Sequence, residues 1–557
     1  MSLAVGLALV PADSRGQPAD GGDPRSEAHA RQAAFERFRV ARLAWSREPG
    51  FGNCDEIVGR FCYRHEAGSE RPPPPEPGGV AAARDALLAR LDAAGRRDPA
   101  DGWILGQRVR YRIEAGRAAE AVGLAAACGA DPWWCAALEG AARHADGDFA
   151  GAERAFDRAL AWMPVAEREI WTDLEPILEP DARRVWRGLG PGAREAFARR
   201  MWWAADPLWS VPGNERRAEH LARHAWDRMQ ESAASAYDVP WGRDLGELLV
   251  RYGWPAGWER SRDDVGRLGA AGRPGVVAHD PPGARRFVPT LAAIADPAVA
   301  RAADWPLDDP TPRATYAPSY ARRFLALAPQ IAAFRRGAST ILAVGWALPP
   351  DSLDSDSGHS DSDPRASGPV VAALLASEGP DRDFIEARDT SAAAGGALRI
   401  EIPWPRAVVG VEALGRGTAA RWRAGLELFG ARPGLPAVSD LLLLEGPRPI
   451  PASLEEALPR ARRASVAAPG ETLGIFWEAY PGGTGAGGPV TVAIRIAAPR
   501  GGAELRWTET LPAAAVVPRA ATLRVPDAPA GDYVIELTVT WPDGAVARSR
   551  RALAIRP

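Results

Sequence analysis

The stretch "IEAGRAAEAVGLAAACGADP" (113–132) is echoed 31–32 residues later by "HADGDFAGAERAFDRALAWMP" (144–164). Three pairs of positions correspond, the last only nearly: Gly116 with Gly147, Ala121 with Ala152, and Pro132 with Pro164. The period is close to the ~34 residues of stacked helix–turn–helix repeats. Because such arrays need about three repeats, flanking helices are expected to complete the stack. The repeat predicts an N-terminal α-helical solenoid.

The second copy resembles a tetratricopeptide repeat. The residues at that family's spacing are Gly140, Gly147, Asp148, Phe149, Ala152, Phe156, Ala159 and Pro164. Its first helix departs from the pattern, since Ala136, Glu139 and Arg143 stand where the family prefers Trp, Leu and Tyr. Small residues let two helices pack closely while aromatics fill the gap between pairs. The resemblance implies a groove that takes an extended peptide or a helix of a partner.

From about residue 315 the apolar period changes to two, which is typical of strands. Predicted strands lie in 330–348, 368–377, 398–405 and 419–428. In the final unit two strands each carry a row of apolar residues on one face: Val490, Val492, Ile494 and Ile496, then Tyr533, Ile535, Leu537 and Val539. A Pro542-Asp543-Gly544 turn closes a hairpin there. Strands at roughly ten-residue spacing predict antiparallel, immunoglobulin-like β-sandwich domains.

Between the two halves, residues 200–260 resemble a GWxTD domain. Asn214, Glu215, Glu219 and Arg223 match the family's N-E…E…R helix, and Trp241, Asp244, Gly246, Tyr252, Gly253 and Pro255 match its GWxTDRG…YGxP run. Pro240, Arg243 and Leu245 depart from that run. The family is bacterial and often exported, and it has no established activity, so the resemblance implies a habitat and no mechanism.

These residues also have a structural interpretation that does not depend on the family. Asn214 is a good N-cap for the helix that follows. "ELLVRYGWP" (247–255) is predicted to be a short strand ending in a turn. Upstream, residues 28–66 are predicted to be helical, with a break at "SREPGFGN" (46–53).

The predicted organisation is a multidomain α+β chain. Its segments are a signal-like and disordered N-terminus (1–26), a helical tetratricopeptide-like region (27–200), a GWxTD-like domain (201–275), an extended linker (276–314), a β-rich domain (315–445) and an immunoglobulin-like β-sandwich (465–557). The apolar run Leu3–Val10 is interpreted as part of an export signal, with a frayed apolar terminus as the alternative. Export predicts a periplasmic or secreted protein.

Composition excludes several function classes. The 557 residues carry a formal net charge of −3, so no basic field points to nucleic acid. All 68 basic residues are arginine, which rules out a lysine-dependent phosphate loop and a Schiff-base lysine. No run of eighteen apolar residues exists to span a membrane. "DSLDSDSGHSDSD" (351–363) lacks the glutamate of a calcium loop and is predicted to be a solvated loop.

The four cysteines are predicted to be disulfide-bonded. Cys54 and Cys62 are eight residues apart, and Cys128 and Cys135 are seven apart, spacings too long for a zinc knuckle and unlike a redox CxxC. In a continuous helix Cys54 and Cys62 would stand about 12 Å apart, beyond disulfide reach. Gly59 must therefore mark a turn, or the pairing is crossed; buried free thiols are the alternative.

His220 and His224 lie one helical turn apart, a spacing that can chelate a metal. Zincins need a glutamate after the first histidine, and Leu221 stands there. The helical wheel places both histidines opposite an apolar stripe, so they are predicted to face solvent without a metal.

Taken together, these patterns predict an exported, non-enzymatic scaffold that binds a protein or peptide, without cofactor or metal. The oligomeric state stays open. The alternative is an envelope hydrolase, metal-dependent in one version, with a site at the helical/β junction using Asp244, His220 or His224.

Overall fold

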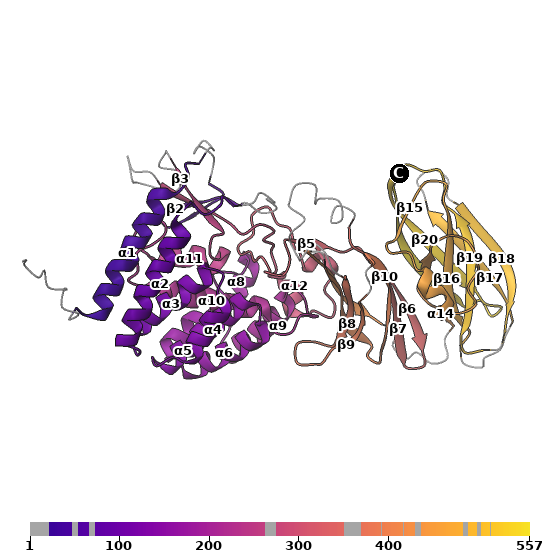
Figure 1. Ribbon diagram of the computed structural model, residues 1–557. Helices are drawn as coiled ribbons and strands as arrows, with labels where there is room; N and C mark the ends of the chain where they lie inside the picture. The colour runs from indigo at the N-terminus through magenta and orange to yellow at the C-terminus, as the bar shows by residue number, and fades with distance from the viewer. Residues whose placement is uncertain are drawn as a thin grey trace, which may run out of the picture.

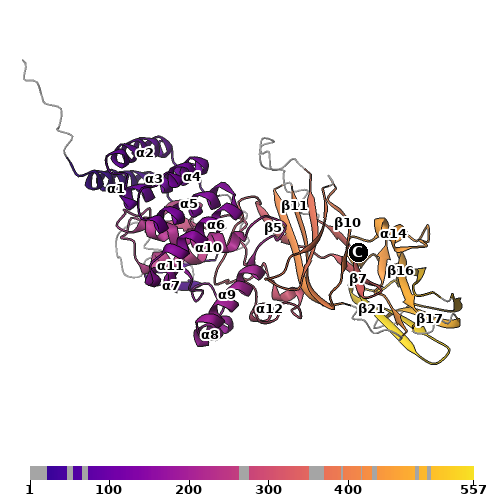
Figure 2. The same cartoon turned by 90° about the horizontal axis from the view of Figure 1, so that it is seen from below.

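The structure is a computed structural model. It describes residues 22–46, 54–65, 73–261, 275–349, 369–390, 393–415, 417–428, 436–482, 488–497, 503–512 and 514–556. The predicted export signal and the acidic loop 351–363 lie outside the described residues. The chain combines helices in its N-terminal half with sheets in its C-terminal half. Both views show the helical part, the first sheets and the last sheets following one another in a row (Figures 1 and 2).

Most of the N-terminal half is helical. The helices are α1 (Pro24–Arg42), α2 (Val80–Arg97), α3 (Gly102–Glu114), α4 (Ala118–Ala126), α5 (Pro132–Asp146), α6 (Phe149–Trp162), α7 (Val165–Trp171), α8 (Pro180–Gly188), α9 (Pro191–Ala205), α10 (Glu215–Gln230) and α11 (Arg243–Tyr252). Several of these helices have a polar N-cap residue. The side chains of Asp23, Asp101, Asp148 and Asn214 accept hydrogen bonds from backbone N–H groups of the first turn. No helix in the described ranges is both long and apolar enough to cross a bilayer.

The internal repeat corresponds to two helical hairpins, α3–α4 and α5–α6. Each hairpin turns at a glycine of positive φ, Gly116 at 71° and Gly147 at 83°. In the second hairpin the helices approach closely, since a Cβ on Gly140 would lie 2.8 Å from the Phe156 ring. The repeated small and aromatic residues therefore set how tightly the paired helices pack.

Helix α10 packs against α3, α5 and α6. Its Ala218, Leu221 and Ala222 join one core with residues of all three helices. Polar contacts fix its position: Gln107 of α3 donates to the carbonyl of Met229, 2.5 Å away. Arg217 of α10 donates to Asp157 of α6 at 2.7 Å. A helix of the same chain thus covers the face that these hairpins would offer to a partner.

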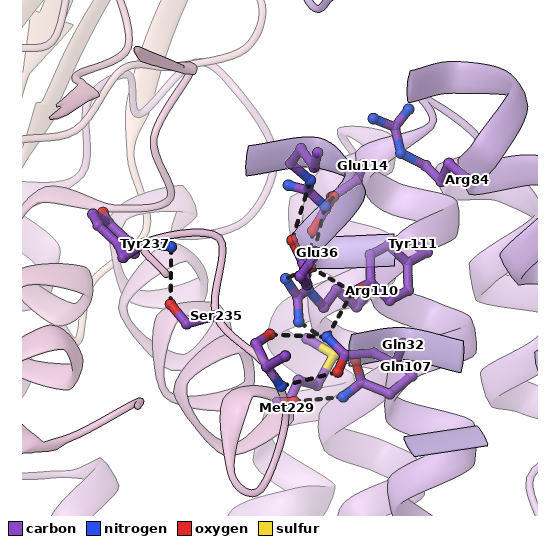
Figure 3. A network of polar contacts seen from close by, with 12 residues as sticks. Gln32, Glu36, Arg84, Gln107, Arg110, Tyr111, Glu114, Met229, Ser235 and Tyr237 are labelled. Atoms are coloured by element: carbon purple, nitrogen blue, oxygen red, sulfur yellow. Dashed lines mark hydrogen bonds and ion pairs between the residues drawn. The ribbon is translucent and has the colours of Figure 1, made fainter. Parts of the chain in front are cut away.

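A buried polar network joins α1 to α3 (Figure 3). Glu36 accepts hydrogen bonds from Arg110 at 2.9 Å and from the Tyr111 hydroxyl at 2.6 Å. Arg39 donates to Glu114 at 2.7 Å, and Arg110 donates to the same carboxylate. All of these side chains are nearly or fully buried. Because each charge has an opposite partner in the dry interior, the network serves packing between helices.

The predicted helix over 28–66 is wrong beyond α1. Residues 54–65 form a β-hairpin, β1 (Glu56–Val58) and β2 (Phe61–Tyr63). Gly59 makes its turn with a φ of 54°, and Cys54 and Cys62 are disulfide-bonded with their Cα atoms 5.3 Å apart. The predicted disulfides are confirmed, since Cys128 is bonded to Cys135 as well. Both pairings are local, and none is crossed.

The segment 275–320 has little regular structure. It contains β4 (Gly275–His279), which pairs with β3 (Gly257–Ser261), then α12 (Leu291–Ala295) and a short 3-10 turn, Ala302–Asp304. It is nonetheless closely packed, since Phe287, Val288 and Ile294 are buried against the helices or the first β-sandwich.

The C-terminal half consists of β-sandwich-like sheets. The strands are β5 (Arg323–Ala326), β6 (Gln330–Arg336), β7 (Ser339–Ala347), β8 (Val371–Ser377), β9 (Ile385–Asp389), β10 (Gly395–Ile402), β11 (Arg406–Gly415), β12 (Thr418–Glu427), β13 (Ala437–Val438), β14 (Leu442–Leu444), β15 (Val466–Ala467), β16 (Thr472–Tyr480), β17 (Gly488–Ala497), β18 (Ala503–Leu511), β19 (Val517–Arg524), β20 (Gly531–Thr540) and β21 (Val546–Ile555). Sheet β5-β12-β11-β8-β9 packs on β10-β7-β6, and the sheet containing β16 packs on β15-β21-β20-β17-β18.

The two sandwiches share an interface made by sheet faces. Phe334 and Ile341, on the outer face of β6–β7, pack with Leu442 and Phe476 of the next sandwich, under the short helix α14 (Leu454–Ala457). Central strands such as β7 and β16 are therefore buried on both faces, which explains why their apolar residues run continuously instead of alternating.

Candidate functional site

A cleft of 2160 Å³ lies in the helical half. It lies among α7, α9, α10 and α11, which are neighbours in Figure 2. Trp171, Trp186 and Trp202 line it. Charged side chains of both signs, arginines and carboxylates, line it as well. Among the candidate residues, Asn214, His220, His224, Asp244 and Gly246 line it. The sequence resemblance and the cleft therefore converge on the same region.

Asn214 connects α10 to α9. Its side-chain oxygen accepts the backbone N–H of Arg217 at 2.9 Å, as predicted for an N-cap. Its amide nitrogen donates to the carbonyl of Trp202 at 2.8 Å, near the end of α9. Both ends of the side-chain amide are thus used in holding two helices together.

Glu219 and Arg223 form an ion pair at 2.6 Å within α10. Arg223 also donates to the carbonyls of Val250, Arg251 and Thr315, at 3.1, 2.7 and 2.8 Å. Gly253 has a φ of 87°, and a Cβ there would lie 3.0 Å from the guanidinium of Arg223. The arginine therefore ties α10 to the end of α11 and to the segment beyond.

Asp227 organises the remaining turn of the motif. The indole of Trp241 donates to its carboxylate at 2.7 Å, and a Cβ on Gly246 would come within 2.7 Å of the same oxygen. Burial raises the pKa of Asp227, although the Trp241 bond lowers it in part. Pro255 lies partly buried in the bend after α11. Gly246 thus permits close packing between α11 and α10.

The segment predicted to be a strand, 247–255, belongs mainly to α11. Leu245, Leu249 and Tyr252 are buried, at the three- and four-residue spacing of one helical face. The strand prediction fails because the segment is too short for its period to distinguish a buried helix from a buried strand.

Asp244 pairs with the disulfide-closed hairpin. Its two carboxylate oxygens accept from the Arg60 guanidinium at 2.6 and 2.8 Å. This hydrogen bonding lowers the pKa of Asp244 to about 2. A Cβ on Gly59 would lie 2.5 Å from the Cβ of Asp244, so the hairpin turn rests directly on α11. A carboxylate held this way is ionised and occupied, which is unfavourable for a general base.

Tyr252 contacts the hairpin at the end away from its turn, through Tyr63 and Glu56. Its ring stacks on Tyr63 with centroids 3.8 Å apart, and its hydroxyl donates to Glu56 at 3.1 Å. Arg251, which is 1% exposed at its side chain, donates to the same carboxylate at 2.8 Å. Burial raises the pKa of the Tyr252 phenol. The hairpin is therefore held at both ends by residues of α11.

Glu215 lies at the start of α10 in a dry pocket. Its carboxyl contacts the hydroxyls of Tyr320 and Tyr316, the latter at 3.5 Å. Burial raises the pKa of Glu215 to about 8, although the tyrosine hydrogen bonds oppose the shift. The carboxyl is therefore mostly protonated at neutral pH.

The prediction that His220 and His224 face solvent is wrong. They are 1% and 7% exposed, because α10 is covered on both sides. The His224 ring stacks on Trp171 at 5.7 Å, and that of His220 lies 5.0 Å from Trp202. Burial lowers the pKa of His224 to about 4 and that of His220 well below its usual value. Both imidazoles are neutral at pH 7.

The histidines do not form a recognisable metal centre. Their ring centroids are 4.8 Å apart, and within the described part of the chain no three His, Cys, Asp or Glu side chains gather closely enough to hold an ion. Neither ring nitrogen of His220 has a hydrogen-bonding partner of good geometry there, although a backbone contact with Trp171 offsets a small part of the lowering of its pKa. Arg216, on the preceding turn, is also buried without a hydrogen bond and lowers the pKa of His220.

Comparison with known proteins gives no family. No protein-family model matches the chain, and no curated protein matches it. Among solved structures it is similar, at 9% identity, to Bacteroides uniformis beta-glucuronidase 2 over 40% of this chain and 27% of that one, with a TM-score of 0.17. It is similar to the FN1–FN3 domains of chicken CNTN1 over 42% and 67%, at 10% identity and a TM-score of 0.16. The tandem repeats of a large adhesion protein match over 42% and 49%, at 14% identity and a TM-score of 0.13.

At these TM-scores the similarities carry no argument about function. The chain spans about a quarter of the glucuronidase and about two thirds of the CNTN1 fragment. The resemblances to GWxTD and tetratricopeptide proteins therefore stay predictions.

Proposed function

We propose that the protein is an exported scaffold of the bacterial cell envelope that binds a protein or peptide partner and catalyses no reaction. The helical half is proposed to be a tetratricopeptide-like array joined to a GWxTD-like unit, and the sheets to be two immunoglobulin-like domains. Two disulfides support export, because such bonds persist in oxidising compartments.

The observation that carries the proposal is the cleft with its exposed apolar rim. Val165 and Ile170 of α7 line the cleft and are each 60% exposed. Exposed apolar residues gathered beside a large hollow are typical of a surface that binds a partner. Since α10 already covers the inner face of the hairpins, the cleft replaces the repeat groove as the binding surface.

The motif residues support a structural role. Asn214, Arg223 and Tyr252 each bind a neighbouring element, and Asp244 is fully engaged by Arg60. Groups occupied in this way are poor acids, bases or nucleophiles unless the contacts break.

A photo-cross-linking amino acid at Ile170 tests the proposal. The control position is Val534, on the opposite, C-terminal sandwich, which is 39% exposed. In cells that make the protein, the residue at 170 is expected to capture a defined partner that the residue at 534 does not. Identical capture from both positions, or none from 170, would contradict the proposal.

The hydrolase alternative has one observation in its favour. Asp244, His220 and His224 all line the same cleft. Two results together would favour the enzyme over the scaffold. The purified protein would contain stoichiometric zinc and hydrolyse an envelope polymer, and His220→Ala would lose both the zinc and the hydrolysis.

A further inference from the structure

A second hollow lies at the open end of the α5–α6 hairpin, and its Pro164 is followed in the chain by Val165 of the cleft. It has a volume of 560 Å³ and is lined by Asp131, Pro132, Trp133, Trp162 and Pro164. We call it the tryptophan slot. One wall comes from the start of α5 and the other from the end of α6 and the residue before α7. The two prolines occupy corresponding positions of the internal repeat.

The first wall of the slot is held rigidly. The disulfide Cys128–Cys135 closes the loop that carries Asp131, Pro132 and Trp133. The adjacent Trp134 donates from its indole to the carbonyl of Gly102 at 2.9 Å, which fixes the loop to α3. A surface held by a covalent bond loses little conformational freedom when it binds a ligand.

The second wall is unusually exposed. Trp162 is the last residue of α6 and is 56% exposed, whereas most tryptophans of the helical half are buried or half-buried. A large indole left in water next to a hollow is a common feature of binding surfaces. Pro164, two residues further on, is the N-cap of α7, whose Val165 and Ile170 lie on the rim of the cleft.

The charge of the slot indicates what it would bind. Among the described residues that line the slot, only Asp131 is charged, and it is exposed. It is the N-cap of α5, but its carboxylate caps no backbone N–H and forms no ion pair within the described residues. A free carboxylate beside the exposed Trp162 indole favours a cation, because the face of an aromatic ring attracts positive charge.

The shape favours a guanidinium over an ammonium. A guanidinium is planar, stacks on indole rings and binds a carboxylate with two N–H groups, whereas an ammonium is compact and strongly hydrated. The buried Trp133 ring already has such a group over it, since Arg228 lies 4.9 Å from its centroid, so the ring left for an outside cation is Trp162. The slot would bind a second guanidinium from outside.

We propose that the tryptophan slot is a docking site for an arginine side chain in an extended segment of the partner protein. The guanidinium stacks against Trp162 and pairs with Asp131, and the segment continues along α7 towards the cleft. This inference rests on the proposed function, because it names the chemistry that the partner presents next to the cleft.

Fluorine NMR of the full-length, disulfide-bonded protein labelled with 5-fluorotryptophan tests the slot. The Trp133 and Trp162 signals are assigned with Trp→Phe variants, and the probes are Ac-Ala-Arg-Ala-NH2, its lysine and alanine counterparts, and a proline-rich peptide. We expect the arginine peptide to shift the Trp162 signal at lower concentration than the others. Asp131→Asn is expected to weaken its binding about fivefold, the range of an exposed ion pair. In Trp162→Ala and Trp162→Phe the binding is followed on the Trp133 signal instead; the alanine variant should weaken it comparably, and the phenylalanine variant less.

Asp146→Asn is the matched control. Asp146 is an exposed carboxylate at the other end of α5, so its change alters the net charge equally without touching the slot. Three results would overturn the inference. The arginine and alanine peptides could bind equally, or the proline-rich peptide could bind more strongly than the arginine peptide. The third is the same loss of binding in Asp131→Asn and Asp146→Asn. If position 170 still captures a partner after such a result, the scaffold proposal stands and only the arginine-binding slot is rejected.

Discussion

Glu412 and Arg423 form a buried ion pair, 2.9 Å between Oε1 and Nη2, where the helical half meets the first sandwich. Their side chains are 1% and 0% exposed. Glu412 also accepts the backbone N–H groups of Trp209 and Ser210, each at 2.9 Å. Arg423 donates to the carbonyl of Asp206 at 2.6 Å and stacks on the Trp209 indole. The pair on β11 and β12 therefore holds the segment that links α9 to α10.

Replacing Glu412 should loosen this junction. Glu412→Ala leaves the Arg423 guanidinium buried without its counter-charge, which costs about 3–5 kcal/mol of stability. The matched control is Glu427→Ala on the same strand pair, where Glu427 and Arg406 form an exposed pair worth about 0–1 kcal/mol. Urea unfolding followed by tryptophan fluorescence compares the two. Similar midpoints for both variants would show that the buried pair does not hold the junction.

Gly59 is expected to be required for docking of the disulfide hairpin. Gly59→Ala must place a side chain at a φ of 54° and against Asp244. Gly116→Ala is the control, because its φ is 71° but nothing lies within 4 Å of the added Cβ. The control should lose about 1–2 kcal/mol from backbone strain alone. Gly59→Ala should lose more and should speed hydrogen exchange in β1, β2 and α11, whereas equal losses would mean that the contact with Asp244 is unimportant.

The cysteines and the histidines show what sequence patterns can and cannot reveal. The spacing of Cys54, Gly59 and Cys62 reduced the choices for bonded cysteines to a turn at Gly59 or a crossed pairing, and the structure has the turn. The burial of His220 and His224 was not predictable. An apolar stripe identifies one packed face of a helix, but a second covering layer supplied by α9, α7 and distant segments leaves no mark on the helix itself.

Long-range polar pairs were missed for a related reason. Glu412 interrupts an apolar strand, and only the approach of residues 204–210 explains its burial. The tryptophan slot did leave a signal, because Pro132 and Pro164 correspond in the repeat and each adjoins a tryptophan or follows one closely. The orientation and exposure of Trp162 still required the structure.

Glu215 should make the protein less stable as pH rises from about 4.5 to about 8. Its pKa is about 8 when folded against 4.5 for an ordinary glutamate, so between these values the folded state retains a proton that the unfolded state has lost. The stabilisation is complete below pH 4.5 and disappears as pH rises through 8. Glu215→Gln should therefore flatten the decline between about pH 5 and 8, by at most about 1.4 kcal/mol per pH unit.

A second buried carboxyl group contributes to the same pH dependence, and an exposed one provides the control. Burial also raises the pKa of Asp206, so some decline should remain in Glu215→Gln. Glu153→Gln, on the partly exposed ion pair with Arg217, is the control and should keep the wild-type slope. Thermal unfolding at several pH values gives the slopes. An unchanged slope in Glu215→Gln would mean that this carboxyl is already ionised in the folded protein.

His224 should have the opposite pH dependence. Its pKa of about 4, against 6.5 when unfolded, means that the folded state resists protonation. Its contribution is therefore present above pH 6.5 and is lost as pH falls through 4. His224→Phe keeps a ring against Trp171 and cannot take up a proton, so it should remove about 3 kcal/mol of the acid destabilisation. His29→Phe is the control, since His29 also stacks on a tryptophan, Trp103, but is only partly buried and should show a smaller effect. Wild type and each variant have the same carboxylates, so the difference in stability between them isolates the contribution of the histidine. Equal differences at positions 224 and 29 would mean that His224 contacts water, as predicted from the sequence.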